Sequence, residues 1–364
     1  MTPAHGNTLS GKAESEYIVG RDARILVTGA NGFIGSKVVR TLLLYGFTRV
    51  RCLTRPTSTS TALERVIKEF SGESIEIVRG NLLSPVDCSI AVKDVSVIYH
   101  LAAGTEKTFP GCFLNSVVTT RNLLEAVSEE KTFKRFVNIS SLAIYSNEKL
   151  QRGALLDETC EIDARLLVER HDPYAYGKAK QDEIVQDYAK SRRIPCVIVR
   201  PGVTFGPGKA KIPGRVGMDT FGLFLHLGLG NQMPLTYVDN CAEAIVLAGL
   251  RKGIEGEIFN IVDDNLPKSR EFLRMYKKQV HRFVSVPVPY RIFYLLNLLW
   301  EKYSKWSEGQ LPPVFNRLFC AAYFKGNAYS NTKAKQMLGW SPRVTMSKGL
   351  SNYCGYARGV MEHK

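Results

Sequence analysis

The sequence lacks several features that would decide its class at once. Its eight cysteines form no C-x-x-C pair and do not cluster with the six histidines in a metal-binding spacing. Several cysteines stand inside apolar runs, so we expect small buried side chains in a reducing compartment and no metal site. No apolar run reaches the roughly eighteen residues of a membrane-spanning helix.

Acidic residues are in deficit. Lys and Arg number 49 against 34 Asp and Glu, which gives a formal net charge of +15. A basic surface gathers anionic ligands, but no helix-turn-helix, zinc-finger or RNA-binding signature accompanies the charge. We therefore expect no nucleic-acid partner. Residues 1–22 are polar and lack the apolar core of a signal peptide, so we expect a flexible leader and a cytoplasmic location.

What the chain does contain is a glycine turn in residues 24–35. A short apolar strand leads into Gly29, Gly32 and Gly35, and an apolar helix follows. A strand that ends in this way directs backbone N–H groups and a helix N-terminus at one point, which suits a pyrophosphate. Gly29 allows the tight turn, Gly32 the approach of the phosphates, and Gly35 the close packing of helix on strand. The turn predicts a dinucleotide site.

Buried strands and helices alternate beyond this turn. This alternation predicts an α/β fold with a parallel, doubly wound Rossmann sheet. We also expect a smaller, mostly helical C-terminal substrate lobe. We expect the NAD(P)-binding domain over residues 23–205, with 236–262 returning to it, and the substrate lobe over 206–235 and 263–364.

The end of the second strand bears on the choice of cofactor. An Asp or Glu at that point would bind a ribose 2′-hydroxyl, whereas an Arg accommodates a 2′-phosphate. This chain has Arg55 there. Arg55 favours NADP over NAD, although an arginine at a strand end also commonly faces solvent.

Candidate catalytic groups follow later strands. Ser141 comes just after the strand expected at 134–140, and ligands lie outside the carboxyl ends of parallel strands. In the helix expected from Pro173, Tyr174 and Lys178 lie four residues apart on one face. A nearby ammonium lowers the pKa of a tyrosine, which then exchanges a proton with a substrate oxygen. A serine hydroxyl would hold that oxygen.

These motifs resemble the extended short-chain dehydrogenase/reductase superfamily, which includes NAD-dependent epimerases and dehydratases, 3β-hydroxysteroid dehydrogenases and related reductases. The resemblance spans about residues 23–351 and implies that Ser141, Tyr174 and Lys178 are catalytic, with Pro173 favouring Tyr174 over Tyr176. Further matching motifs are His100-Leu-Ala-Ala103, Arg200-Pro-Gly-Val-Thr-Phe-Gly-Pro-Gly208, Tyr237-Val-Asp-Asn-Cys-Ala-Glu-Ala244, Ile258-Phe-Asn-Ile-Val262 and Ala334-Lys-Gln-Met-Leu-Gly-Trp-Ser-Pro342.

The resemblance also implies a set of residues that bind NADP or NAD. Asn81 stands where the family usually has Asp near the adenine, so we expect that contact with altered strength. Near the family's helix Asn, the chain offers Asn115 or Ser116. The predicted cofactor-binding residues are Gly29, Asn31, Gly32, Phe33, Ile34, Gly35, Arg55, Asn81, Leu82, Leu101, Ala102, Ala103, Tyr174, Lys178, Pro201 and Val203.

Departures from family patterns narrow the reaction. Leu142-Ala143 replaces the Asp-Glu pair of sugar-nucleotide 4,6-dehydratases, so dehydration lacks its acid and base. Residues 232–236 lack the Arg that epimerases often use for a diphosphate, although Arg215, Lys209 or Lys211 could take its place. We expect an NAD(P)-dependent oxidoreductase for a secondary alcohol or ketone on a sterol-like or sugar-type substrate. The alternatives are a nucleotide-sugar epimerase with tightly bound NAD and a non-catalytic NAD(P)-binding regulatory protein.

The segment 286–306 is apolar and carries Lys302, Lys305 and Trp306 near its end. Its length favours a core helix of the small lobe. A basic, aromatic-flanked apolar helix also suits a membrane interface, so a peripheral membrane contact through 286–306 stays open. The helices at 113–129 and 173–191 are candidates for a homodimer contact by analogy with relatives.

Overall fold

The computed structural model describes residues 16–58, 61–70, 74–220, 222–308, 310 and 316–362. At its centre a seven-stranded sheet has the order β12-β7-β5-β4-β1-β2-β3, with every pairing parallel. The expected doubly wound parallel sheet is confirmed. Its strands are β1 (Ile25–Thr28), β2 (Val50–Thr54), β3 (Ile75–Arg79), β4 (Val97–His100), β5 (Arg135–Ile139), β7 (Cys196–Pro201) and β12 (Ile258–Ile261).

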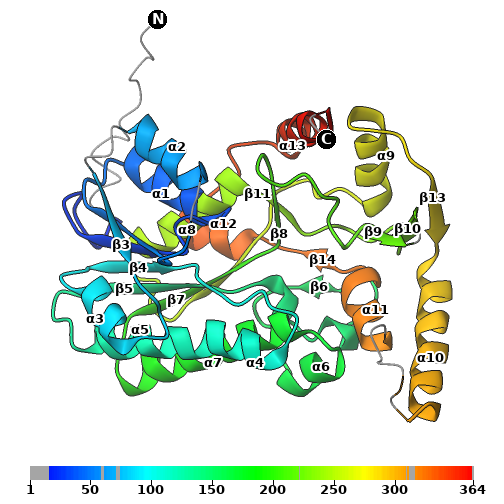
Figure 1. Cartoon of the computed structure of the whole chain (residues 1–364), viewed down its shortest axis with the longest axis horizontal. Coiled ribbons are helices and arrows are strands. Elements are labelled where there is room, and N and C mark those ends of the chain that lie inside the picture. The colour runs from blue at the N-terminus through cyan, green and yellow to red at the C-terminus, as the bar shows by residue number, and fades with distance from the viewer. Residues whose placement is uncertain are drawn as a thin grey trace, which may run out of the picture.

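Helices cover both faces of this sheet, because successive side chains of a strand point to opposite sides. Ile25 and Val27 pack in one hydrophobic core with α1 (Gly35–Leu44), α2 (Thr61–Glu69), α8 (Val238–Leu250) and α12 (Thr332–Leu338). Leu26 packs in a second core with α3 (Pro85–Val92), α5 (Thr119–Ser128) and α7 (Pro173–Ser191). Figure 1 shows the sheet between these two helical layers.

The C-terminal lobe combines helices with short strands around a core of its own. The strands β9 (Gly217–Thr220), β10 (Leu223–Leu227) and β13 (Ser285–Val288) form a three-stranded sheet near α9 (Ser269–Gln279) and α13 (Met346–Glu362). Helices α10 (Tyr290–Trp306) and α11 (Arg317–Phe324) lie at the edge of the molecule. Smaller elements are β6 (Leu155–Leu156) with β14 (Ala328–Tyr329), β8 (Val203–Phe205) with β11 (Leu235–Tyr237), α4 (Phe109–Cys112) and α6 (Ala164–Glu169).

Ordered contacts begin before the expected domain boundary at residue 22. Residues 1–15 of the expected leader lie outside the described residues. From Tyr17 onward the chain touches the domain: Tyr17 forms a bridge with Arg251, and the Ile18 N–H donates to the Leu250 carbonyl at 2.9 Å. Three partly buried apolar residues in an otherwise polar segment, Tyr17, Ile18 and Val19, pack against the main core. Residues 16–22 therefore belong with the domain.

Helix α10 contradicts the expectation of a core helix. Its buried side chains are Phe293, Asn297 and Ser304, which form one narrow stripe. Most of its other apolar side chains are exposed. An apolar run alone does not reveal how much of a helix its neighbours cover, and here α11 covers one side. Among the described residues, no helix is both long and apolar enough to cross a bilayer.

Candidate active site

The glycine turn forms a cradle at the carboxyl end of β1, where the strand order reverses between β1 and β4. Gly29 has a φ of +65°, and a Cβ there would lie 3.0 Å from the Ala102 nitrogen. A Cβ on Gly35 would lie 2.1 Å from the Gly29 carbonyl oxygen. No described side chain caps the start of α1, and of its first N–H groups that of Ser36 donates to the Gly32 carbonyl at 3.1 Å. This cradle fits a pyrophosphate.

Two cavities of about 480 and 300 Å³ meet at the turn. The larger cavity contains the three predicted catalytic residues. Every predicted cofactor-binding residue lines one cavity or both. The larger cavity is lined by Gly29, Gly32, Phe33, Ile34, Gly35, Leu101, Ala103, Ser141, Tyr174, Lys178, Pro201 and Val203, and the smaller one adds Asn31, Arg55, Asn81, Leu82 and Ala102. The roles of these residues stay predictions, but the structure brings the whole set together.

Tyr174 and Ser141 meet inside the larger cavity. Helix α7 begins at the predicted residue, and the Asp172 side chain caps it. Tyr174, the second residue of the helix, lines this cavity together with Ser141, whose side chain lowers the pKa of Tyr174. Tyr176, the alternative acid, instead packs edge-on against Phe109 with ring centroids 5.4 Å apart. Of the two tyrosines, Tyr174 is therefore the one placed to touch a substrate oxygen.

The titration of Tyr174 differs from our expectation. Burial raises the pKa of Tyr174, and the hydrogen bond from Ser141 offsets only part of that effect. The Lys178 ammonium is engaged elsewhere: it donates to the Ile139 carbonyl at 2.5 Å and to Gln181 Oε1 at 2.8 Å. Burial also lowers the pKa of Lys178 to about 8. At neutral pH Tyr174 is thus a proton donor and not a phenolate.

A buried chain of hydrogen bonds connects Lys178 to the strand of the glycine turn. Gln181 accepts from Lys178 and donates its Nε2 to Thr120 Oγ1 at 2.7 Å. His100 Nε2 lies 2.9 Å from the same Thr120 oxygen, and His100 Nδ1 lies 2.8 Å from Thr28 Oγ1. Burial lowers the pKa of His100 to about 3, so the ring is neutral. The His100 that we identified only as part of a family motif holds α5 and β1 together.

Asp182 ties α7 to the end of β5, one turn beyond Lys178. Its carboxylate accepts from Ser140 Oγ and from Asn138 Nδ2, each at 2.9 Å, and pairs with Arg200 Nε at 3.1 Å. All these side chains are buried. Because Ser140 precedes Ser141, the predicted catalytic serine, the cluster fixes the strand end relative to the helix that carries Tyr174. Asp182 was not among the predicted site residues, although an acid four residues after Lys178 is the signal that the sequence offers for it.

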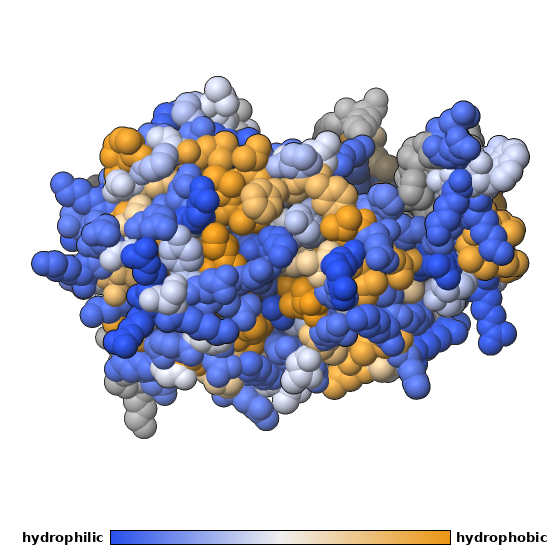
Figure 2. All heavy atoms as spheres, turned by 90° about the horizontal axis from the view of Figure 1, so that it is seen from below, coloured by the Kyte–Doolittle hydropathy of each residue, from blue (hydrophilic) through white to orange (hydrophobic). Residues whose placement is uncertain are grey.

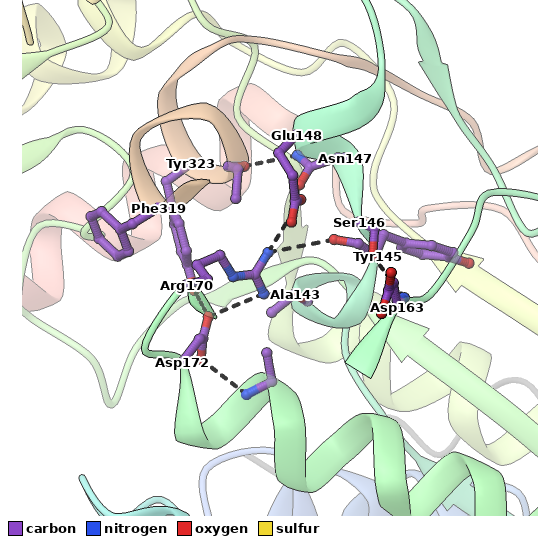
Figure 3. Close-up of polar contacts among 12 residues, drawn as sticks. Ala143, Tyr145, Ser146, Asn147, Glu148, Asp163, Arg170, Asp172, Phe319 and Tyr323 are labelled. Carbon is purple, nitrogen blue, oxygen red and sulfur yellow. Dashed lines mark hydrogen bonds and ion pairs between the residues drawn. The ribbon is translucent and has the colours of Figure 1, made fainter. Parts of the chain in front are cut away.

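A second charge cluster joins the loop after β5 to the lobe (Figure 3). Arg170 Nη2 donates to the Ala143 carbonyl at 2.5 Å and pairs with Asp172 Oδ2 at 3.2 Å. Glu148 Oε2 lies 3.8 Å from Arg170 Nη1. Tyr323, on α11, donates its hydroxyl to Asp172 Oδ2 at 2.8 Å. The loop after β5, the start of α7 and the lobe helix α11 therefore meet at Arg170.

The structure separates the two residues proposed for the family's helix Asn. Ser116 is buried and accepts from the Gly104 N–H at 3.0 Å. Asn115 lines the smaller cavity and donates to Glu106 Oε1 at 2.8 Å. Both lie in a π-helical stretch, Phe113–Val118, which turns consecutive residues toward different surroundings. Asn115 is the one beside the predicted cofactor site.

Basic side chains line the larger cavity from the lobe side. Lys209 Nζ lies 4.6 Å from the centroid of the Phe33 ring, and Arg215 Cζ lies 4.8 Å from the centroid of the Tyr323 ring. Lys211 is exposed and does not line the cavity. Of the three cations considered for an anionic substrate group, the structure places Lys209 and Arg215 at the site.

Comparisons with known proteins agree with this geometry. The model of the NAD dependent epimerase/dehydratase family matches residues 25–262. Cinnamoyl-CoA reductase 1 of Oryza sativa subsp. japonica is 27% identical over 188 residues, covering 52% of this chain and 55% of that protein, so the match spans little more than half of that relative. UDP-glucose 4-epimerase of Vibrio cholerae is 23% identical over 336 residues, covering 90% and 93%.

A solved structure extends the likeness in fold. UDP-glucuronic acid 4-epimerase from Bacillus cereus, in complex with NAD, superposes with a TM-score of 0.68 at 22% identity and covers 93% of this chain and 99% of that one. At this identity the match concerns the fold.

Proposed function

Because the chain belongs to the NAD dependent epimerase/dehydratase family, we propose that it is an NAD(P)-dependent oxidoreductase that interconverts a secondary alcohol and a ketone. The observation that carries this proposal is that Ser141, Tyr174 and Lys178 line one cavity, which continues to the glycine cradle. The substrate is sterol-like or sugar-type.

The residues present fit a nicotinamide cofactor. Gly29, Gly32 and Gly35 leave room for its pyrophosphate, and Leu101 and Ala103 border both cavities. When bound, the nicotinamide supplies or accepts the hydride. We propose NADP as the preferred form, because Arg55 stands exposed on the wall of the smaller cavity, where a 2′-phosphate would find a cation.

Side chains of the protein itself transfer the proton to the substrate oxygen. Ser141 holds the substrate oxygen by a hydrogen bond, and Tyr174 donates its proton to that oxygen during reduction. The raised pKa of Tyr174 keeps this proton in place at neutral pH. As the proton leaves, negative charge develops on the Tyr174 oxygen, and Lys178 on the same helix face supplies the positive charge that stabilises it. Protonated Tyr174 is the form that reduction of a ketone requires.

A second candidate is a nucleotide-sugar epimerase, favoured by the nearly full-length match to the Vibrio cholerae enzyme. Epimerisation uses the same residues, because it is oxidation followed by reduction on the other face of the ketone. The two functions separate on one preparation. Net consumption of NADPH with a ketone supports the reductase. NAD that stays bound to the protein through gel filtration, together with interconversion of UDP-sugars without net oxidation or reduction, supports the epimerase.

Turnover with matched tyrosine variants tests the main proposal. NADPH and NADH oxidation is measured with a panel of sterol-like and sugar-type ketones. We expect activity in the wild type and in Tyr176→Phe, and its loss in Tyr174→Phe while cofactor binding persists. Equal losses in both variants would point to a structural effect of the helix instead.

We further propose that α10 contacts a membrane surface. At about 100° per residue, its exposed apolar side chains fall within roughly 140° of the helix circumference. Exposed Arg291, Lys302 and Lys305 flank this face, which suits anionic lipid headgroups. Figure 2 shows hydrophobic residues at the end of the molecule where β13 and α10 lie in Figure 1. The exposed apolar residues are Ile292, Leu295, Leu296, Leu299, Trp300, Tyr303 and Trp306.

A homodimer contact through residues 113–129 and 173–191 also stays a proposal. These residues lie in the helical layer below the sheet, and Figure 2 views that layer face on. Hydrophobic patches are interspersed there among hydrophilic residues, and the exposed Phe113 and Leu114 belong to the first of the two segments. Light scattering of the purified protein would test it.

A further inference from the structure

We propose that Arg170 is a positioning residue for the reaction: it holds the turn that follows Ser141 against the start of the helix that carries Tyr174. This inference rests on the proposed function, because it concerns how the two predicted catalytic hydroxyls are kept in place. Arg170 is not one of the described residues that line the larger cavity. It would therefore act through its neighbours and not by touching the substrate.

Two contacts of Arg170 are with the turn that follows Ser141. Ser141 begins a short 3₁₀ turn, Leu142–Ile144, and its side chain accepts from the Ala143 N–H at 3.2 Å. Arg170 Nη2 donates to the carbonyl of the same Ala143 at 2.5 Å, and Arg170 Nη1 donates to the Tyr145 carbonyl at 3.5 Å. Both ends of the guanidinium fork thus hold the turn to which the Ser141 side chain is bonded.

The next contact of Arg170 is with the cap of the helix that carries Tyr174. Asp172 Oδ1 accepts from the Ala175 N–H at 2.9 Å, which satisfies one of the N–H groups that the first turn of α7 leaves free. The other carboxylate oxygen, Asp172 Oδ2, lies 3.2 Å from Arg170 Nη2. Because Tyr174 is the second residue of this helix, the cap joins its backbone to Arg170.

Burial strengthens these contacts. Arg170 is 1% exposed, and the side chains of Glu148 and Asp172 are 4% and 10% exposed. Glu148 Oε2 lies 3.8 Å from Arg170 Nη1, and the Tyr323 hydroxyl donates to Asp172 Oδ2 at 2.8 Å (Figure 3). A guanidinium keeps its proton, so separating it from these carboxylates in a buried place is costly. A shift of the turn relative to the helix would therefore break a charged contact.

Arg165 offers a matched contrast on the neighbouring helix. Its Nε lies 3.4 Å from Oδ1 of Asp163, which caps α6 as Asp172 caps α7. The Arg165 side chain is 88% exposed, and its hydrogen bonds among the described residues go to Asp163 and not to the turn after Ser141. Both arginines pair with a capping aspartate, but of the two Arg170 alone is buried and joined to both predicted catalytic segments.

The first test measures kcat, KM and the Kd of NADPH, with a ketone that the wild type reduces. Misplacing a reacting group by about 1 Å costs on the order of 10²-fold in rate. We expect Arg170→Met to lower kcat by roughly 10- to 100-fold and to leave the Kd of NADPH unchanged. Arg170→Lys, which keeps the charge, should recover part of this loss, and Arg165→Met should behave as the wild type.

A second background separates positioning from a general loss of structure. If Arg170 acts by placing the Tyr174 hydroxyl, its removal should cost less once that hydroxyl is gone. Single-turnover rates should therefore show non-additive losses when Arg170→Met is combined with Tyr174→Phe. Losses that multiply fully would overturn the proposal, as would a wild-type kcat in Arg170→Met.

Asp172→Asn decides the question if Arg170→Met does not fold. Asparagine is a good helix cap, but it has one acceptor oxygen, so it cannot cap α7 and hold Arg170 at the same time. We expect thermal melting to show a folded protein, with a kcat lowered as in Arg170→Lys. A folded Asp172→Asn with the wild-type kcat would overturn the proposal. Loss of folding in every variant of the cluster would do the same, because the cluster would then serve stability alone.

Hydrogen exchange followed by mass spectrometry keeps this inference separate from the proposed function, because it needs no substrate. We expect peptides that cover residues 141–147 and 172–178 to exchange faster in Asp172→Asn than in the wild type, and peptides of the glycine turn to be unchanged. Unchanged exchange in both segments would overturn the proposal. Absence of turnover by the wild type with every ketone tested would contradict the proposed function alone.

Discussion

The two ends of the larger cavity differ. At the cofactor end, beside the glycine turn, buried polar side chains hydrogen-bond one another. At the lobe end, beside α11, the side chains of Arg215 and Tyr323 line the cavity. His100 is held between Thr28 and Thr120 at the first end. Arg215 has carbonyl and aromatic contacts but no carboxylate among the described residues at the second. We therefore expect changes at the cofactor end to affect stability and chemistry, and changes at the lobe end to affect the choice of substrate.

The largest effect should come from breaking the cofactor end at Asp182. Asp182→Asn removes the buried carboxylate that compensates Arg200, whose guanidinium cannot lose its proton. We expect the free energy of unfolding to fall by about 3–5 kcal/mol. Denaturant titration measures it, with Glu183→Gln as the control, because the exposed pair of Glu183 with Lys180 should contribute less than about 1 kcal/mol. A similar loss of unfolding free energy in both variants would contradict the role of Asp182 as the buried partner of Arg200.

The pH dependence of reduction should be the next largest effect. Lys178 has a pKa of about 8, so its charge is lost above that pH. We expect kcat to fall toward tenfold per pH unit above about pH 8. Lys178→Arg, which stays charged, should move this fall to higher pH. A wild-type profile that is flat up to pH 10 would contradict the role given to Lys178.

The contribution of Lys178 to protein stability should change with pH in the direction opposite to the change in activity. The folded pKa of Lys178 lies below its ordinary value of 10.5, so between about pH 8 and 10.5 the unfolded chain binds a proton that the folded chain does not. Stability from this group therefore rises with pH across that window. Thermal melts over the same pH range separate the loss of charge from unfolding, and a melting temperature that falls in step with activity would refute this explanation.

Much of the cofactor end was predictable from the sequence because its constraints are local. The glycine turn follows from spacing and backbone geometry at Gly29 and Gly35, and the Tyr174–Lys178 face follows from one helical turn. The cluster of Arg170, Asp172 and Tyr323 was not predictable, because its members come from separate elements and no spacing relates them. The pKa of Tyr174 also required the fold, since it depends on burial and on where the Lys178 ammonium points.

The lobe end extends to the surface through α11 and α10, which allows a third, smaller test. Leu296→Glu with Leu299→Glu places charge on the exposed apolar face of α10 and should reduce binding to phosphatidylglycerol vesicles by roughly tenfold or more. Vesicle co-sedimentation measures it, and Val86→Glu, an exposed position on α3, serves as the control. Unchanged vesicle binding by the double variant, or no binding by the wild type, would contradict the proposed membrane contact.

The smallest effect should appear at the far side of the cofactor end. Arg55→Ala removes the exposed cation that we assign to a 2′-phosphate. We expect KM for NADPH to rise by up to about tenfold and KM for NADH to stay unchanged, since an exposed charge pair contributes about 1 kcal/mol. Equal changes for both cofactors would show that Arg55 does not distinguish them.

The most direct test of the whole account follows the hydride together with the proton donor. NADPH deuterated at carbon 4 of the nicotinamide is incubated with a ketone and the wild type, Tyr176→Phe or Tyr174→Phe, and the product is examined by mass spectrometry. We predict deuterium on the former carbonyl carbon with the first two proteins and a loss of transfer of roughly 10²-fold or more with Tyr174→Phe. Transfer by Tyr174→Phe at the wild-type rate would contradict the account.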